Sequence, residues 1–176
     1  NTPSIIPAII IGVMNELACL LSVFLLDRTG RRKLYMIGIS GMIPSLALLG
    51  VCFHFKEALG ASLPVFAVLS IVCYIVFIAI SLAPLGWLLI SEIFPLNVRG
   101  VGMSIGSLSH WAFNAVIAFT FLKLVNSLGI DVTFWCYAVI CLISAVWGYY
   151  YIPETKGKSL EDIESFWRKG NNPRKL

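Results

Sequence analysis

Charged residues are scarce in this chain. Asp, Glu, Lys and Arg make up 12% of its 176 residues, whereas soluble domains carry about 25%. Apolar residues make up 59%, and a soluble domain of this length has too little interior to hide them all. The composition excludes an ordinary soluble domain and predicts a protein that lies within a lipid bilayer.

Sequence patterns for catalysis or metal binding are also lacking. The chain has two histidines, no serine–histidine–acid spacing and no glycine-rich phosphate loop. The cysteines lie in or at the edges of apolar runs, with neither metal-ligand spacing nor a disulfide framework, so we interpret them as small buried hydrophobes. They are Cys19, Cys52, Cys73, Cys136 and Cys141. The sequence therefore predicts no enzyme, no cofactor, no metal and no nucleic-acid partner.

What the chain does have is a series of long apolar runs. A helix needs about 20 apolar residues to cross a hydrocarbon core of about 30 Å. Lipid cannot satisfy free backbone groups, so such runs must form helices. The predicted spans are 5–26, 34–53, 63–90, 101–125 and 134–152. We expect an all-α membrane protein with five transmembrane helices in 1–152, and kinks at Pro44 and Pro84, because proline removes a helical hydrogen bond.

The distribution of Lys and Arg predicts the orientation. Of 13 such residues, all but Lys56 and Lys123 lie in the loops after the first and third runs or in the tail. The positive-inside rule places that side in the cytoplasm, with the N-terminus outside and the C-terminus inside. The chain begins almost within an apolar run and has an odd number of spans, so we expect a piece of a longer protein.

The residues after the last run, 153–176, form a predicted cytoplasmic tail. Pro153 ends the last helix, and Ser159-Leu-Glu-Asp162 is typical of a capping box. Apolar side chains then recur on one face of a short amphipathic helix, about 159–169. We expect this helix to lie against the bundle or the membrane surface.

Three motifs carry a resemblance to a known family. They are Asp27-Arg-Thr-Gly-Arg-Arg32, Ser91-Glu-Ile-Phe-Pro-Leu-Asn-Val-Arg-Gly100 and Pro153-Glu-Thr-Lys-Gly-Lys-Ser159. In order and spacing they resemble the sugar porter branch of the major facilitator superfamily, over nearly the whole chain. The resemblance implies helices 8 to 12 of a twelve-helix carrier, that is, a partial bundle from the carboxyl-terminal half. It also implies the missing amino-terminal half as a partner, and the plasma membrane as the location.

The same resemblance implies a gate on the cytoplasmic side. In related carriers, arginines of the first motif pair with carboxylates and hold the inner gate shut, and Glu92 and Glu154 are the candidate acceptors here. Arginine suits such bidentate pairing. The alternative is that Arg31 and Arg32 only fix the topology. The predicted gate set is Asp27, Arg28, Arg31, Arg32, Glu92, Arg99 and Glu154.

Candidate sugar contacts lie in the fourth run. Ser107, His110, Trp111 and Asn114 share one helical face. A polar stripe with a tryptophan is costly toward lipid, so we expect it to face a cavity or a neighbouring helix. His110-Trp-Ala-Phe-Asn114 resembles the family's polar–Trp–x–x–Asn segment. His110 either contacts sugar or bonds to another helix, and Trp111 and Asn114 are assigned to the site or its surroundings.

The third run contains a predicted hinge. Ala83-Pro-Leu-Gly-Trp87 resembles the family's Gly-Pro-x-x-Trp element, which implies a hinge at Pro84 and Gly86 and places Trp87 in the cavity. Ala83 departs from the usual glycine. Ala79 stands where animal glucose carriers place an acidic residue, so one expected sugar hydrogen bond is absent.

In the first run, Asn15 matches a sugar-binding asparagine of the family. Glu16 beside it is a departure, and an ionisable group at that depth is a functional candidate. It either couples transport to protons, or is protonated or bonded to a helix absent from this chain.

The predicted function is transmembrane transport of a monosaccharide or polyol by alternating access, facilitative or proton-coupled. We do not expect this chain to transport alone, because alternating access needs two halves. One alternative is a non-transporting sugar sensor, against which the short tail counts. The other is an organic-ion carrier, which needs paired charges inside the bundle, where only Glu16 is available.

Overall fold

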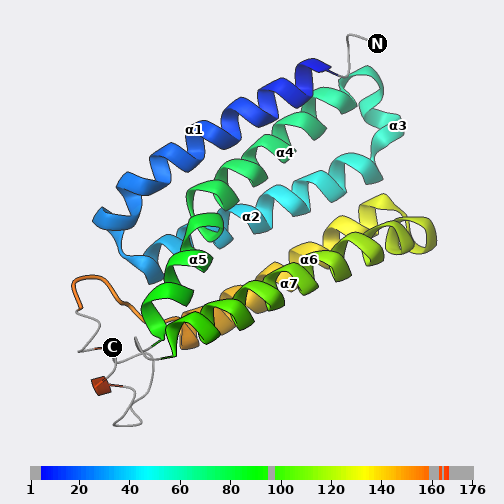
Figure 1. Cartoon of the computed structure of the whole chain (residues 1–176). Helices are drawn as coiled ribbons and strands as arrows, with labels where there is room; N and C mark the ends of the chain where they lie inside the picture. The colour runs from blue at the N-terminus through cyan, green and yellow to red at the C-terminus, as the bar shows by residue number, and fades with distance from the viewer. Residues whose placement is uncertain (1–4, 95–97, 159–162, 164, 167–176) are drawn as a thin grey trace.

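The computed structural model describes residues 5–94, 98–158, 163 and 165–166, and every regular element among them is a helix (Figure 1). The long helices are α1 (Ile5–Thr29), α2 (Arg31–His54), α4 (Leu63–Ile80), α5 (Leu82–Ile93), α6 (Arg99–Leu128) and α7 (Ile130–Tyr151). A short α3 (Lys56–Leu59) and a 3-10 turn, η2 (Gly60–Ser62), join α2 to α4. Five stretches are long and apolar enough to cross a membrane, with α3 to α5 counted as one. The predicted all-α fold is confirmed.

Helix α2 lies at the centre of the bundle. It packs against α7, α4, α5 and α1. Half of the residues in its most apolar stretch are buried. Figure 1 shows α1 and the α6–α7 pair on opposite sides of α2 and α4. The helix ends gather at two poles: the arginine end, which holds Arg31, Arg32 and Arg99, and the histidine end, which holds His54.

Small residues on α2 allow this close packing. A β-carbon on Gly38 would overlap the Ser81 hydroxyl, one on Gly41 would overlap the Phe77 ring, and one on Gly50 would overlap the Trp135 indole. Glycine lowers helix propensity by about 1 kcal/mol relative to alanine. Its presence at these positions therefore indicates that close approach to α4 and α7 outweighs the loss.

The third predicted segment is not one continuous helix. The expected bend takes the form of a one-residue interruption, because α4 ends at Ile80 and α5 starts at Leu82, while Lys56–Ile93 as a whole still counts as one apolar stretch. Between them Ser81 has φ −119° and ψ −81°. Pro84 has no N–H to donate to the carbonyl of Ile80, four residues earlier, and its ring clashes with that carbonyl. The proline therefore acts one turn before its own position, at Ser81.

Helix α2 behaves differently at its own proline. It runs as one α-helix from Arg31 to His54, with Pro44 inside.

Most of the predicted tail helix, 159–169, lies outside the described residues. Of its apolar face, Ile163 is described and is buried.

Candidate functional site

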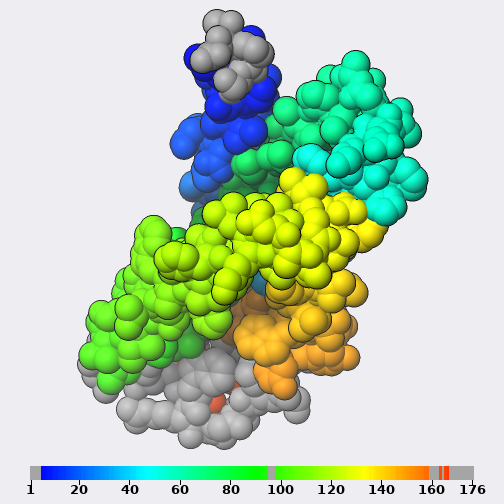
Figure 2. Space-filling view, turned by 90° about the vertical axis from the view of Figure 1, so that its right-hand side faces the viewer, coloured from blue at the N-terminus to red at the C-terminus, as the bar shows by residue number. Residues whose placement is uncertain are grey.

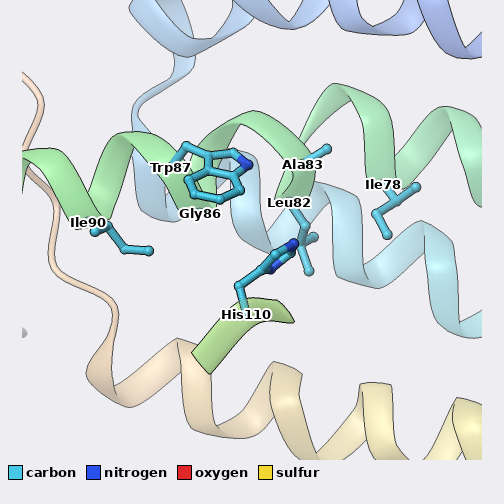
Figure 3. A pocket seen from close by; sticks show the side chains of 7 residues that line it. All are labelled: Ile78, Leu82, Ala83, Gly86, Trp87, Ile90 and His110. Carbon is cyan, nitrogen blue, oxygen red and sulfur yellow. The ribbon is translucent and has the colours of Figure 1, made fainter. Parts of the chain in front are cut away.

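A cavity of about 330 Å³ lies where α4, α5 and α6 meet (Figure 3). Its lining residues are Ile78, Leu82, Ala83, Gly86, Trp87, Ile90 and His110. The Trp87 and His110 rings are 5.2 Å apart between centroids and are tilted by 60°. No atom lies within 4 Å of a β-carbon placed on Gly86, so the α5 wall stays open there. The break at Ser81 thus lies beside a cavity with apolar walls and one imidazole.

A second cavity, of about 570 Å³, shares Trp87 and Ile90 with the first. It is lined by Trp87, Ile90, Met103, Ser104, Ser107, Leu108 and Trp111. The His110 and Trp111 rings meet edge to face at 5.7 Å. Trp87, His110 and Trp111 therefore form a continuous run of rings from α5 to α6.

Asn114 orients His110 from one helical turn away. Its Nδ2 donates to the His110 backbone oxygen at 3.0 Å and lies 3.1 Å from the imidazole Nε2. An amide N–H can donate only to an imidazole nitrogen that carries no proton. The two contacts with Asn114 therefore hold the His110 ring in one orientation beside the cavity.

Asn15 is not brought to these cavities. It lies half-buried on α1, its neighbour Glu16 is exposed, and neither lines the two cavities. Ala79 stands at the position where animal glucose carriers place an acidic residue. It is 1% exposed, packs inside the bundle and lines neither cavity. The structure therefore groups the candidates on α5 and α6 and leaves the α1 candidate apart.

The arginine end holds an ion pair between α2 and α5. Arg31 Nη2 lies 2.7 Å from Glu92 Oε1, and Arg31 Nε donates to Glu92 Oε2 at 3.4 Å. Thr155 Oγ1 donates to the same Oε2 at 2.5 Å. Both charged side chains are largely buried, at 14% and 18% exposed. The pair thus joins three segments that are far apart in sequence.

Glu154 makes a different contact from the one predicted. Its carboxylate accepts hydrogen bonds from the backbone N–H groups of Arg31 at 2.9 Å and Arg32 at 3.3 Å. These are free donors at the start of α2, where the helix dipole favours a negative charge. Gly30 permits this, since it has φ +91° and a β-carbon there would lie 2.6 Å from Glu154 Oε2. Glu154 caps a helix rather than pairing with a guanidinium.

The remaining predicted gate residues are arranged as follows. Arg32 donates to the Tyr149 backbone oxygen, and its guanidinium carbon lies 5.0 Å from the Tyr149 ring centroid. Lys156 Nζ donates to the Arg28 oxygen at 2.5 Å. Among the described residues, the Asp27 and Arg28 side chains form no ion pair, and the Nε and Nη2 atoms of Arg99 are buried without a hydrogen-bond partner.

Sequence reasoning missed Thr155, Tyr149 and Ser81. Thr155 lies inside the Pro153 motif, so its position next to Glu154 was the available signal. Tyr149 contributes a backbone oxygen and a ring, neither of which has a sequence signature. Ser81 could have been found by counting back from Pro84 to the carbonyl that its ring disrupts.

Comparison with known proteins places this geometry in a family. A sequence model of the sugar (and other) transporter family matches residues 1–167. The D-xylose-proton symporter-like 1 of Arabidopsis thaliana is 40% identical over 158 residues, which cover 90% of this chain and 31% of that protein. The facilitated trehalose transporter Tret1 of Aedes aegypti is 34% identical over 159 residues, 89% of this chain and 20% of that protein.

The solved structures agree with the sequence relatives. An inward-open xylose transporter XylE from E. coli aligns with TM-score 0.82 and 33% identity over 92% of this chain and 35% of that one. XylE bound to 6-bromo-6-deoxy-D-glucose, a structure of a major facilitator superfamily proton:xylose symporter, aligns with TM-score 0.83 and 32% identity. The chain thus spans about a third or less of the length of these relatives. It has the fold of that part of a major facilitator superfamily transporter and belongs to the sugar (and other) transporter family.

Proposed function

We propose that this chain is part of a carrier that moves a monosaccharide or polyol across a membrane by alternating access. The observation that carries the proposal is the cavity beside Trp87 and His110, directly beyond the helix break at Ser81. A flat indole suits the apolar face of a sugar ring, and the imidazole N–H suits a hydroxyl. Small-molecule sites combine apolar walls with a few polar groups in this way.

The exposure of α6 supports a missing partner. Among its residues only Gly102 is buried, and Trp111 is 65% exposed. Figure 2 shows α6, from green to yellow, lying uncovered across one face of the molecule. Its polar stripe of Ser107, His110 and Asn114 would be costly against lipid. We propose that the amino-terminal half of the same carrier covers this face and completes the sugar site.

The finer assignments belong to the same proposal. The helical unit 1–152 corresponds to transmembrane helices 8 to 12 in the carboxyl-terminal half, and 153–176 is a cytoplasmic tail. The arginine end then faces the cytoplasm, following the positive-inside rule, and the protein lies in the plasma membrane. In support, the chain matches about a third of its first relatives and carries the three motifs quoted above.

The arginine end acts as the gate in this proposal. The Arg31–Glu92 pair and the Glu154 cap tie α2 to α5 and to the segment after α7. Any movement of α5 about Ser81 would have to break or carry along the Arg31–Glu92 pair. A carrier state in which Arg31 and Glu92 are in contact differs from one in which they are apart by a largely buried ion pair. The pair therefore shifts the balance between these two states.

The substrate class follows from the pocket and from the relatives. The relatives are named for D-xylose and for trehalose, so pentoses, hexoses and a disaccharide are all to be compared. Transport is facilitative or proton-coupled, with Glu16 as the candidate coupling group in this chain. A sugar sensor or an organic-ion carrier are the alternatives that the same experiment separates.

The test is uptake by the intact carrier in lipid vesicles. Labelled xylose, glucose, trehalose, a polyol and an organic cation are supplied with and without a proton gradient. We expect saturable uptake of at least one sugar or polyol, weakened by Trp87→Ala and retained in Trp147→Ala, which removes an exposed tryptophan of α7. Sugar binding without uptake would favour the sensor, and uptake of the organic cation alone would refute the proposal.

A further inference from the structure

At the histidine end, a contact between an imidazole and a carboxylate joins α2 to α7. His54 Nδ1 lies 2.8 Å from Asp131 Oδ2. His54 is the last residue of α2, and Asp131 is the second residue of α7. The side chains are 50% and 23% exposed, respectively, so water and protons reach the pair.

Both helix ends favour the charged forms of these residues. The C-terminal end of α2 attracts a cation and the N-terminal end of α7 attracts an anion, because of the aligned peptide dipoles. His54 is the basic group in the last turn of α2, and Asp131 is the acidic group in the first turn of α7. A protonated imidazole therefore gains from its own helix end as well as from the carboxylate.

Aromatic contacts hold the imidazole in this position. The His54 ring centroid lies 5.4 Å from the Trp135 ring and 5.0 Å from the Phe55 ring. Trp135 is fixed in turn, because its Nε1 donates to the Ala47 oxygen at 3.3 Å. Among the described residues, the other charged side chains at this end are Lys56 and Glu57 on α3 and Lys123 on α6. Lys56 and Glu57 are of opposite sign.

The two ends of the α2–α7 pair thus differ in how they respond to protons. At the arginine end Arg31 and Arg32 keep their charge at every physiological pH. Histidine instead changes charge between pH 5 and 8. We propose that the His54–Asp131 pair is a proton-operated latch, which fastens the start of α7 to the end of α2 in acid and loosens as the pH rises.

The sign of the effect follows from the charges. Above about pH 5 the carboxylate is ionised, so the imidazole decides. In acid the pair is a full ion pair, and its contribution to stability is present. As the pH rises and the imidazole loses its proton, only a hydrogen bond is left, and the ion-pair contribution disappears. This latch does not depend on the sugar site.

The test is a double-mutant cycle in the intact protein. His54→Gln, Asp131→Asn and the double variant keep hydrogen-bonding groups and remove charge, and their thermal unfolding is compared with wild type at pH 5.5 and 8.0. We expect coupling between the two sites that changes the unfolding equilibrium about two- to fivefold at pH 5.5. At pH 8.0 we expect little or none.

Two further measurements guard against indirect effects. His110→Gln removes the other histidine of this chain and should leave the coupling and its pH dependence intact. Amide exchange in the first turn of α7 of the wild type, corrected for the intrinsic effect of pH, should show stronger protection at pH 5.5 than at pH 8.0. Equal coupling and equal protection at both pH values would overturn the proposal.

Discussion

Gly38 and Ser81 fit together so closely that a side chain on Gly38 would overlap the Ser81 hydroxyl and β-carbon. Ser81 in turn donates its hydroxyl to the Phe77 oxygen at 2.6 Å and is fully buried. The break between α4 and α5 therefore packs directly against α2 at Gly38, where the missing side chain leaves room for Ser81. A break that is held in this way can serve as a defined pivot for α5.

Gly38→Ala should destabilise the protein. The added methyl group would meet the Ser81 side chain and lie 3.1 Å from the Phe77 backbone oxygen, which cannot rotate away. Overpacking of this kind costs about 1–3 kcal/mol, and the unfolding temperature should fall. The matched control is Gly12→Ala on α1, where no atom lies within 4 Å and the better helix propensity of alanine should leave the protein as stable or slightly more stable. Equal unfolding temperatures for both variants would remove the packing argument.

Pro84→Ala should slow the carrier without weakening sugar binding. The alanine N–H can donate to the Ile80 oxygen, which favours one continuous helix through Ser81 and stiffens the pivot. We expect a lower maximal transport rate with an unchanged dissociation constant, and stronger amide protection around residue 84. Pro44→Ala is the control, because α2 already runs continuously through its proline. If both variants transport at the wild-type rate, Ser81 is not a pivot.

The Arg31–Glu92 pair should show energetic coupling that Arg32 lacks. Arg31→Gln, Glu92→Gln and the double variant form one cycle, and Arg32→Gln with Glu92→Gln forms the control cycle. We expect coupling of about 1–2 kcal/mol in the first cycle, because the pair is largely buried and charge-assisted, and close to zero in the second. The measurement is thermal unfolding together with the ratio of inward- to outward-facing states. Similar coupling in both cycles would mean that the arginines act only through their general positive charge.

Asn15 and Glu16 should differ in their effect on sugar affinity. They are neighbours on α1, but Asn15 is half-buried and Glu16 is exposed. The family resemblance assigns Asn15 to the sugar site, although it lines neither cavity, and an asparagine offers both a donor and an acceptor to a sugar hydroxyl. Asn15→Ala should therefore raise the dissociation constant of the intact carrier, whereas Glu16→Gln should leave it nearly unchanged. Calorimetry from pH 5 to 8 measures both. A pH-dependent affinity that vanishes only in Glu16→Gln would instead assign proton coupling to Glu16.

Much of the fold could be predicted from composition alone. Lipid forces apolar runs into helices, so the runs from Ile5 and from Phe134 were expected as helices before any contact was known. A bend near Pro84 was expected, but the close fit of Ser81 against Gly38, which lies 43 positions away in sequence, was not. Periodicity within a single run contains no information about such a contact.

The site was predictable in its residue types and less so in its contacts. The spacing of His110 and Asn114 predicts that they meet on one helical face, and Asn114 does contact His110. The partner of Glu154 was not predictable, because a carboxylate near two arginines is expected to bind a guanidinium. Here it binds the backbone N–H groups that start α2, since Gly30 leaves room for it there.

The central claim is that the cavity beside Trp87 binds sugar. The most direct measurement is calorimetric sugar binding to the intact carrier as wild type, Trp87→Ala and Trp147→Ala. Trp87 lines both cavities, whereas Trp147 is 58% exposed on α7 and stacks on Tyr151. Loss of one aromatic contact with a sugar, about 1.5–3 kcal/mol by analogy with burial of an apolar side chain, corresponds to roughly a 10- to 150-fold weaker affinity. We predict that loss for Trp87→Ala and wild-type affinity for Trp147→Ala; unchanged affinity in Trp87→Ala would contradict the account.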